Sequence, residues 1–223
     1  MLSSLVGISV VYSVMFLFLV IISYLPQWRS YRVYVKAATS AVFVSMAIVG
    51  VVTSGTTGRM LVMLLGFLSC MIGDILLGVV NKEGKKKYMM GGAIAFMAGH
   101  IWYVIGIGSL APFTWQQFLI PCLAVVLMFF LLKIPTLHPG RMRPYAMLYS
   151  FFVSLLFSKG LFVLLTGVNL RAIFIFVGVS LFLISDFIII FLYFGEKKNK
   201  ILGFFNMLTY FLAQYFLALT MFF

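Results

Sequence analysis

The 223-residue chain carries 16 basic and 4 acidic residues, so 9% of it is charged and 64% is hydrophobic. A soluble domain is about 25% charged and roughly 45–50% apolar. This difference excludes a soluble enzyme, a nucleic-acid-binding protein and a disordered chain. A secretory signal peptide alone is also excluded, because apolar segments recur along the whole sequence. The composition therefore predicts a multi-pass membrane protein.

Apolar runs of membrane-spanning length recur between charge clusters and Gly or Pro breaks. A hydrocarbon core of about 30 Å needs roughly 20 such residues in a helix. The runs are continuously apolar rather than alternating, which favours helices over a β-barrel. Because the connections are short, we predict an all-α transmembrane bundle of about eight spans, forming a single transmembrane domain over residues 1–223. The predicted spans are Leu5–Tyr24, Val33–Val52, Met60–Val80, Tyr88–Gly108, Trp115–Leu132, Tyr145–Thr166, Leu170–Phe194 and Ile201–Phe222.

The net charge of +12 comes mainly from alternate loops. The only basic residues in the intervening loops are Arg59 and Arg171. The positive-inside rule places the basic loops in the cytoplasm and, with eight spans, both termini on the extracytoplasmic side. The expected location is the cytoplasmic membrane of a bacterial cell. The basic loop residues are Arg29, Arg32, Lys82, Lys85, Lys86, Lys87, Lys133, Arg141, Arg143, Lys197, Lys198 and Lys200.

Two of the four acidic residues, Asp74 and Asp186, lie inside predicted spans, and the other two lie in Lys-rich loops. A carboxylate at the centre of a membrane helix costs about 2.5–3.5 kcal/mol. Residues of this kind face the bundle interior or a wet cavity and usually mark a functional site. The alternative is a buried structural ion pair with Lys36 or Lys159.

Both aspartates fall at a similar depth. At about 1.5 Å per residue, Asp74 lies roughly 10 Å and Asp186 roughly 13 Å from the cytoplasmic ends of their helices. The two aspartates thus share one layer of the bundle. Polar residues of other spans lie about 5–20 Å from the same cytoplasmic face, and together they predict a polar pocket that opens to the cytoplasm. These other residues are Lys36, His100, Tyr103, Asn206, Tyr210 and Gln214.

The arrangement of these residues also suggests a parallel repeat of four spans. The third and seventh spans each carry an aspartate, and the spans that follow carry His100 and Gln214 at similar depths. Cys70 and Cys122 lie within apolar runs and are interpreted as packing residues. Neither a metal nor a cofactor is expected, because the histidine and aspartates lack an HEXXH-type spacing and the cysteines are too few.

Five motifs, taken in order, resemble the YhhN/lysoplasmalogenase family of membrane proteins. The second, third and fourth spans contain YVKAATSAVF, LLGFLSCMIGDILLG and GGAIAFMAGHIWYVIG, and the last two contain GVSLFLISDFIIIF and LTYFLAQYFLAL. The resemblance covers essentially the whole chain. Two departures are that Lys36 is followed by Ala37 where the family usually has proline, and that the sixth span matches weakly after its tyrosine.

The resemblance implies a hydrolase that cleaves the vinyl ether bond of lysoplasmalogens to a fatty aldehyde and a glycerophospho-choline or -ethanolamine. It implies that Asp74 and Asp186 are the catalytic pair and that the other polar residues listed above line the site. The implied partners are a lysophospholipid substrate and membrane lipids, with no nucleic acid, protein partner, metal or cofactor. Lys36 is suited to the substrate phosphate.

Vinyl ether hydrolysis begins with proton transfer to an alkenyl carbon, which generates an oxocarbenium ion. One protonated carboxyl and one carboxylate suit this chemistry, as they do at glycosidic bonds. Which aspartate is the acid stays open. Two alternatives use the same residues: a proton-coupled transporter or channel, in which they form a relay, and a lipid-binding or structural membrane protein.

Overall fold

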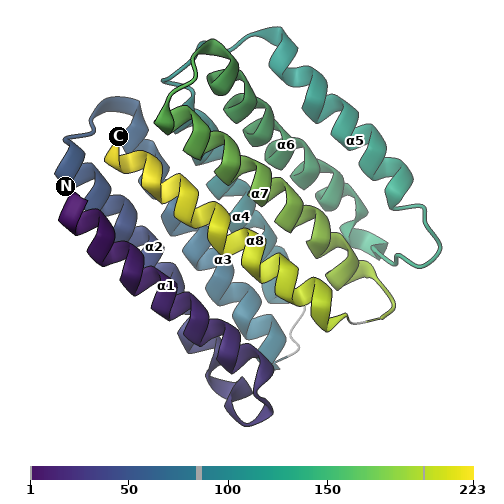
Figure 1. Cartoon of the computed structure of the whole chain (residues 1–223). Coiled ribbons are helices and arrows are strands. Elements are labelled where there is room, and N and C mark those ends of the chain that lie inside the picture. The colour runs from purple at the N-terminus through teal and green to yellow at the C-terminus, as the bar shows by residue number, and fades with distance from the viewer. Residues whose placement is uncertain (1, 84–86, 198) are drawn as a thin grey trace. The chain divides into compact units, whose positions relative to one another are not determined.

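The computed structural model describes residues 2–83, 87–197 and 199–223, and within these ranges every regular element is helical (Figure 1). The all-α prediction is confirmed, because each predicted span corresponds to one helix of the described chain. The helices are α1 Leu2–Tyr24, α2 Arg32–Ser54, α3 Met63–Glu83, α4 Lys87–Ile107, α5 Leu119–Leu131, α6 Arg143–Thr166, α7 Leu170–Phe194 and α8 Lys200–Leu219.

Seven of the described helices are long and apolar enough to cross a membrane, and α5 is shorter. The predicted fifth span began at Trp115, but a 3-10 turn occupies Trp115–Phe118 and the α-helix begins at Leu119. Turn and helix together form a 17-residue apolar segment, Trp115–Leu131, at the lower limit of the roughly 17–25 residues needed to span. The orientation of the helices in a membrane and the side on which the termini lie stay predictions.

The chain divides into two compact units, each built mainly from four consecutive helices. The N-terminal unit comprises the residues up to Gly106 together with Ala218–Phe223, and the C-terminal unit comprises Ile107–Leu217. The division agrees with the suggested repeat of four spans. The single domain expected over residues 1–223 stays a prediction.

In the N-terminal unit, α2 packs against both α1 and α3, and α3 meets α4 through glycines. At five successive levels a larger side chain of one helix lies over a glycine of the other, and the larger side chain comes alternately from α3 and α4. A Cβ at any of these glycines would lie within 2.9 Å of the facing side chain. Such close approach is typical of membrane helices, where small residues let backbones pack. The pairs are Met63–Gly106, Tyr103–Gly66, Cys70–Gly99, Phe96–Gly73 and Leu77–Gly92.

The C-terminal unit packs by the same principle. Helix α6 contacts both α5 and α7. Gly160 of α6 lies against Val179 of α7, and Gly178 of α7 lies against Leu217 of α8. At the start of α7, the Asn169 side chain accepts a 2.9 Å hydrogen bond from the Ala172 amide, which caps an otherwise unpaired helix N-terminus. These contacts fix which face of α7 is turned toward α6 and α8.

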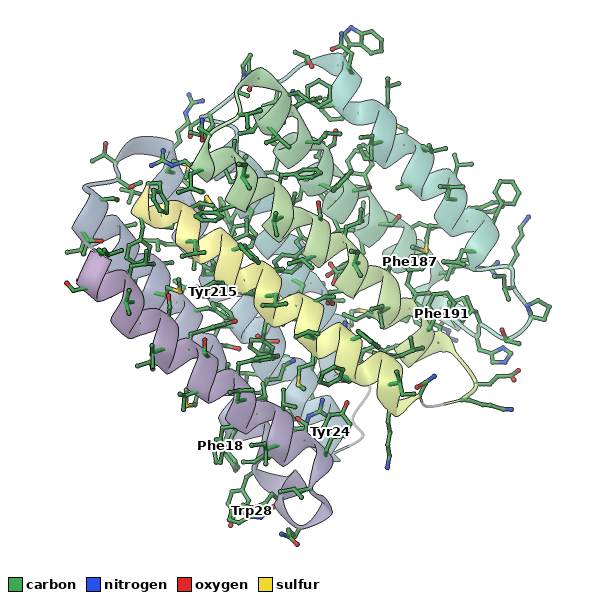
Figure 2. The ribbon with its side chains drawn as sticks, in the orientation of Figure 1. Phe18, Tyr24, Trp28, Phe187, Phe191 and Tyr215 are labelled. Atoms are coloured by element: carbon green, nitrogen blue, oxygen red, sulfur yellow. The ribbon has the colours of Figure 1, made fainter. Side chains whose placement is uncertain are left out.

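Large apolar side chains remain exposed along the outer helices, as expected where lipid replaces water. Figure 2 shows Phe18 and Tyr24 on α1 and Trp28 in the turn after it. Trp28 and Tyr31 are exposed, and their rings lie 5.7 Å apart between centroids. Exposed Trp and Tyr are typical of the membrane–water interface, which agrees with the predicted loop position after the first span. Of the predicted loop charges, Lys85, Lys86 and Lys198 lie outside the described residues.

Candidate functional site

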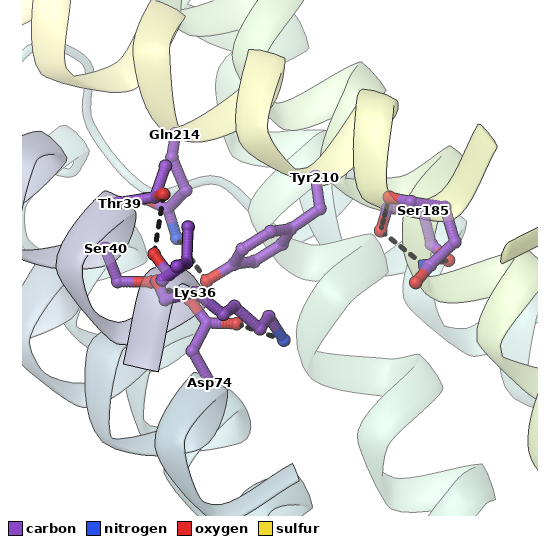
Figure 3. A network of polar contacts seen from close by, with 9 residues as sticks. Lys36, Thr39, Ser40, Asp74, Ser185, Tyr210 and Gln214 are labelled. Carbon is purple, nitrogen blue, oxygen red and sulfur yellow. Dashed lines mark hydrogen bonds and ion pairs between the residues drawn. The ribbon is translucent and has the colours of Figure 1, made fainter. Parts of the chain in front are cut away.

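Asp74 forms the centre of a buried polar cluster between α2 and α3 of the N-terminal unit. The Lys36 ammonium lies 2.8 Å from Asp74 Oδ1, and the Ser40 hydroxyl donates a 2.6 Å hydrogen bond to Oδ2. Lys36 and Ser40 are four residues apart, so both side chains leave the same face of α2. Figure 3 shows both directed at Asp74. Each carboxylate oxygen therefore has its own partner.

Burial makes these partners necessary. Asp74 is 1% exposed and Ser40 is completely buried, whereas the Lys36 side chain is 20% exposed. A carboxylate transferred from water to an apolar interior is tolerated when it is paired and hydrogen-bonded. The ammonium stabilises the charged form of Asp74, and the result is a fixed carboxylate that can accept a proton or stabilise a cation. One of the two ion pairs considered from the sequence, Lys36 with Asp74, is formed.

His100 and Tyr103, which were predicted to line the site, are both completely buried on α4 of the same unit. The Tyr103 ring lies over Gly66 and makes an edge-on contact with Phe67, with centroids 5.0 Å apart. Tyr103 is therefore part of the α3–α4 packing described above. A direct role of either residue in substrate binding stays a prediction.

Asp186, also buried, has a different partner in the C-terminal unit. The Tyr149 hydroxyl of α6 donates a 3.0 Å hydrogen bond to Asp186 Oδ2. The sequence interpretation did not include Tyr149 among the site residues. Helix depth could have found it, since Tyr149 lies about 9 Å from the start of its helix, close to the roughly 13 Å of Asp186 from the end of α7.

Asn206 of α8 forms hydrogen bonds to Ser185 of α7, the residue before Asp186. Its amide nitrogen donates to the Ser185 backbone carbonyl and lies 2.9 Å from the Ser185 hydroxyl as well. Figure 3 shows Ser185 with these contacts. The amide thus fixes the backbone beside Asp186, a structural use that the prediction of a site-lining residue did not include.

Tyr210 and Gln214 continue the face of α8 that was predicted from their spacing. The Gln214 amide lies 3.3 Å from the Tyr210 hydroxyl, and the Tyr210 ring contacts Phe182 of α7 edge-on at 5.5 Å. Both residues are buried. Asn206 and Tyr210 therefore face α7, which agrees with the helical pattern of the sequence.

Lys159, the other cation inside a span, is not part of the Asp186 cluster. Its ammonium donates a 2.6 Å hydrogen bond to the Ala111 carbonyl and lies 3.9 Å from the centre of the Phe113 ring. A buried ammonium is stabilised by carbonyl oxygens and by an aromatic face. Lys159 therefore ties the segment before α5 to α6.

The two aspartates belong to different units, Asp74 to the N-terminal and Asp186 to the C-terminal one. Their action as a catalytic pair, and the polar pocket expected at their depth, stay predictions. Among the described residues, no three His, Cys, Asp or Glu side chains gather closely enough to hold a metal ion. The expectation of a site without metal or cofactor also stays a prediction.

Comparison with known proteins gives one match. The model of the YhhN family matches residues 31–221, from the turn before α2 into the last helical turn of the chain. The matched range contains every residue of the Asp74 and Asp186 clusters. No curated protein and no solved structure matches the chain.

Proposed function

Because the chain belongs to the YhhN family, we propose that it is a membrane-embedded hydrolase that cleaves the vinyl ether bond of lysoplasmalogens. The products are a fatty aldehyde and glycerophosphocholine or glycerophosphoethanolamine, as the resemblance of the five sequence motifs implies. The observation that carries the proposal is the buried Asp74 carboxylate with Lys36 and Ser40 as its partners. It is a fixed intramembrane negative charge of the kind that an oxocarbenium-forming reaction needs.

In the proposed reaction, a protonated carboxyl transfers its proton to the alkenyl carbon that is not bonded to oxygen. The neighbouring carbon becomes an oxocarbenium centre, which a carboxylate stabilises. Water adds to that centre and gives up a proton to the carboxylate. The hemiacetal then collapses to the aldehyde: its hydroxyl proton returns to the group that acted as the acid, and the group that took the proton of water gives it to the departing glycerol oxygen. One water molecule is consumed for each bond cleaved, and both carboxyl groups regain their starting states.

The different partners of the two aspartates support different roles. Asp74 lies against an ammonium, which favours its charged form, so we assign it as the carboxylate that stabilises the cation and accepts the proton of water. Asp186 accepts from a neutral phenol, which places no positive charge on it. We assign Asp186 as the proton donor.

Lys36 is suited to a second task. Its ammonium has three donors, one oxygen of Asp74 is its partner, and a fifth of its side chain is exposed. We assign this partly exposed ammonium to the substrate phosphate as well, while the apolar helices accommodate the single hydrocarbon chain. The proposed location is the cytoplasmic membrane of a bacterial cell, with the basic loops in the cytoplasm.

A second candidate function is a proton-coupled transporter or a lipid-binding membrane protein that uses the same aspartates. The observation that favours it is the Lys36–Asp74 ion pair itself, because intramembrane ionisable residues pair in proton relays as well as in purely structural sites. A transporter predicts substrate flux in proteoliposomes without chemical conversion. A structural pair predicts a loss of stability and no turnover.

The deciding experiment is an assay of the purified protein against a panel of lysolipids, with aldehyde release as the readout. The panel contains alkenyl, alkyl and acyl chains on choline and ethanolamine headgroups. The expected result is aldehyde from the alkenyl lipids alone, lost in Asp74→Asn and retained in Glu196→Gln, an exposed loop acid. Full activity of a folded Asp74→Asn variant, or flux without aldehyde, would contradict the proposal.

A further inference from the structure

The Tyr149–Asp186 contact lies between helices whose mutual position is fixed by packing. Gly160 of α6 lies against Val179 and Ile175 of α7, where an added Cβ would come within 2.6 Å of Val179. The two helices are therefore held closely together, and sliding of α6 along α7 would lose this fit. Tyr149 meets Asp186 at the same interface.

Helix α8 fixes the other side of the aspartate. Asn206 bonds the Ser185 carbonyl, and the Ser185 hydroxyl in turn lies 3.3 Å from the Asn206 carbonyl. This reciprocal contact holds the α7 backbone at the residue before Asp186. With the backbone held from α8 and one carboxyl oxygen held from α6, the Asp186 carboxyl has a defined orientation.

We propose that Tyr149 is a positioning residue for Asp186: its hydroxyl holds Oδ2 and so orients the carboxyl that carries and delivers the catalytic proton. This inference rests on the proposed function. A neutral phenol supplies a hydrogen bond without a charge, and a buried carboxyl is less costly in its neutral form than as a carboxylate. The proton leaves the Asp186 carboxyl for the alkenyl carbon. The carboxylate that remains regains a proton when the hemiacetal hydroxyl is deprotonated, while Asp74 returns the proton it took from water to the departing glycerol oxygen.

The same hydrogen bond assists the transfer itself. When Asp186 loses its proton, the Tyr149 hydroxyl donates to a carboxylate instead of a neutral carboxyl. Hydrogen bonds to charged acceptors are about twice as strong as neutral ones. Tyr149 therefore stabilises the state formed by proton transfer more than the state before it, which is the condition for accelerating the step.

Infrared spectroscopy tests this proposal without relying on turnover. A protonated carboxyl gives a C=O stretching band that a carboxylate lacks, and a lost hydrogen bond moves the band to higher wavenumber. The chain has only two aspartates, Asp74 and Asp186, so ¹³C-aspartate labelling identifies their signals. We expect one protonated-aspartate band at neutral pH, present in Asp74→Asn and absent in Asp186→Asn.

The variant is Tyr149→Phe, which removes only the hydroxyl, and the matched control is Tyr145→Phe, an exposed tyrosine one turn earlier on α6. We expect the band to move to higher wavenumber in Tyr149→Phe alone, and aldehyde release to fall about tenfold in kcat, as for one lost hydrogen bond. An unshifted band in Tyr149→Phe, or no protonated aspartate in the wild type, would overturn the proposal.

These outcomes separate the two hypotheses. A band that shifts in Tyr149→Phe, in a protein that releases no aldehyde from any alkenyl lysolipid, would refute the hydrolase and leave the hydrogen-bonded, protonated Asp186 in place. Aldehyde release with an unshifted band would support the hydrolase and refute the role of Tyr149. If Asp186→Asn does not fold, the ¹³C-labelled wild type and Asp74→Asn still assign the band.

Discussion

In each unit, a side chain of the second helix contacts a buried aspartate of the third helix, but the chemical group that makes the contact differs. In the N-terminal unit, Lys36 of α2 meets Asp74 of α3, and in the C-terminal unit Tyr149 of α6 meets Asp186 of α7. Both aspartates are buried and stand on the third helix of their unit, and each partner comes from the second. What differs is the charge of the partner.

This difference gives two residues of the same type different electrostatic surroundings in one chain. An ammonium at 2.8 Å from Asp74 compensates a full negative charge, whereas the hydroxyl at 3.0 Å from Asp186 compensates none. The Ser40 hydroxyl also donates a hydrogen bond to Asp74. The two carboxyl groups therefore have different electrostatic surroundings, which is the condition that the proposed separation of acid and base roles requires.

The largest expected effect is on turnover. Asp74→Asn and Asp186→Asn should each lower kcat for aldehyde release about a thousandfold, since general acid or base catalysis contributes roughly 10²–10⁴-fold. Groups that act in one reaction are strongly non-additive. The double variant should therefore be about as slow as the slower single one. Multiplied losses would indicate that the two aspartates act independently.

The second prediction compares how much the partner of each aspartate contributes to the free energy of unfolding. Lys36→Met leaves the Asp74 charge without its ammonium, and we expect unfolding in detergent to become easier by about 2–4 kcal/mol, below the largest values because Lys36 is partly exposed. Tyr149→Phe should cost only about 1 kcal/mol, the value of an ordinary hydrogen bond. Equal losses of stability in Lys36→Met and Tyr149→Phe would mean that the charged and the neutral partner contribute equally, contrary to this comparison.

A paired replacement sharpens this result. Lys36→Met combined with Asp74→Leu removes both charges, and buried ion pairs replaced by apolar residues are often as stable as the original. The double variant should regain most of the stability lost in Lys36→Met and yet release no aldehyde. Recovery of stability together with wild-type turnover would assign the pair a structural role only.

Substitutions at the glycines packed against α3 and α7, the helices that carry the aspartates, should cost about 1–3 kcal/mol, because added volume in a packed interface forces side chains apart. A Cβ at Gly99 would lie 2.7 Å from Cys70 Sγ, and one at Gly160 would lie 2.6 Å from Val179. Gly99→Ala and Gly160→Ala should both lower the unfolding midpoint. Gly7→Ala, with nothing within 4 Å, should raise it slightly through helix propensity. Equal changes of the unfolding midpoint in all three variants would show that the contacts at Gly99 and Gly160 are not tight.

The smallest expected effect concerns Ser40. Ser40→Ala removes one hydrogen-bond donor to Asp74 and leaves the Lys36 ion pair in place. We expect a loss of about 1 kcal/mol in stability and a modest fall in kcat, both smaller than for Lys36→Met. Ser13→Ala on α1, whose hydroxyl bonds only the Ser9 carbonyl at an exposed position, is the control and should change neither.

Much of this arrangement could be predicted from local sequence, and the exceptions have physical causes. Apolar run length gave the helices, and helical spacing gave the face of α8 that contains Asn206 and Tyr210. Helix α5 was overestimated at its start, because a 3-10 turn precedes it and composition does not distinguish the two helix types. Tyr149 was missed because its depth in the sixth span was not compared with that of Asp186, although the two depths are similar.

The sequence by itself determined that the protein is helical and apolar, that it belongs to the YhhN family, and that Asp74 and Asp186 are its only acidic residues inside spans. These features follow from the cost of polar groups in hydrocarbon, which acts residue by residue. Only the tertiary structure decided which partner each aspartate receives and that Lys159 bonds backbone carbonyls instead. The rotation and register of neighbouring helices, set by the glycine contacts between them, determine which side chains meet.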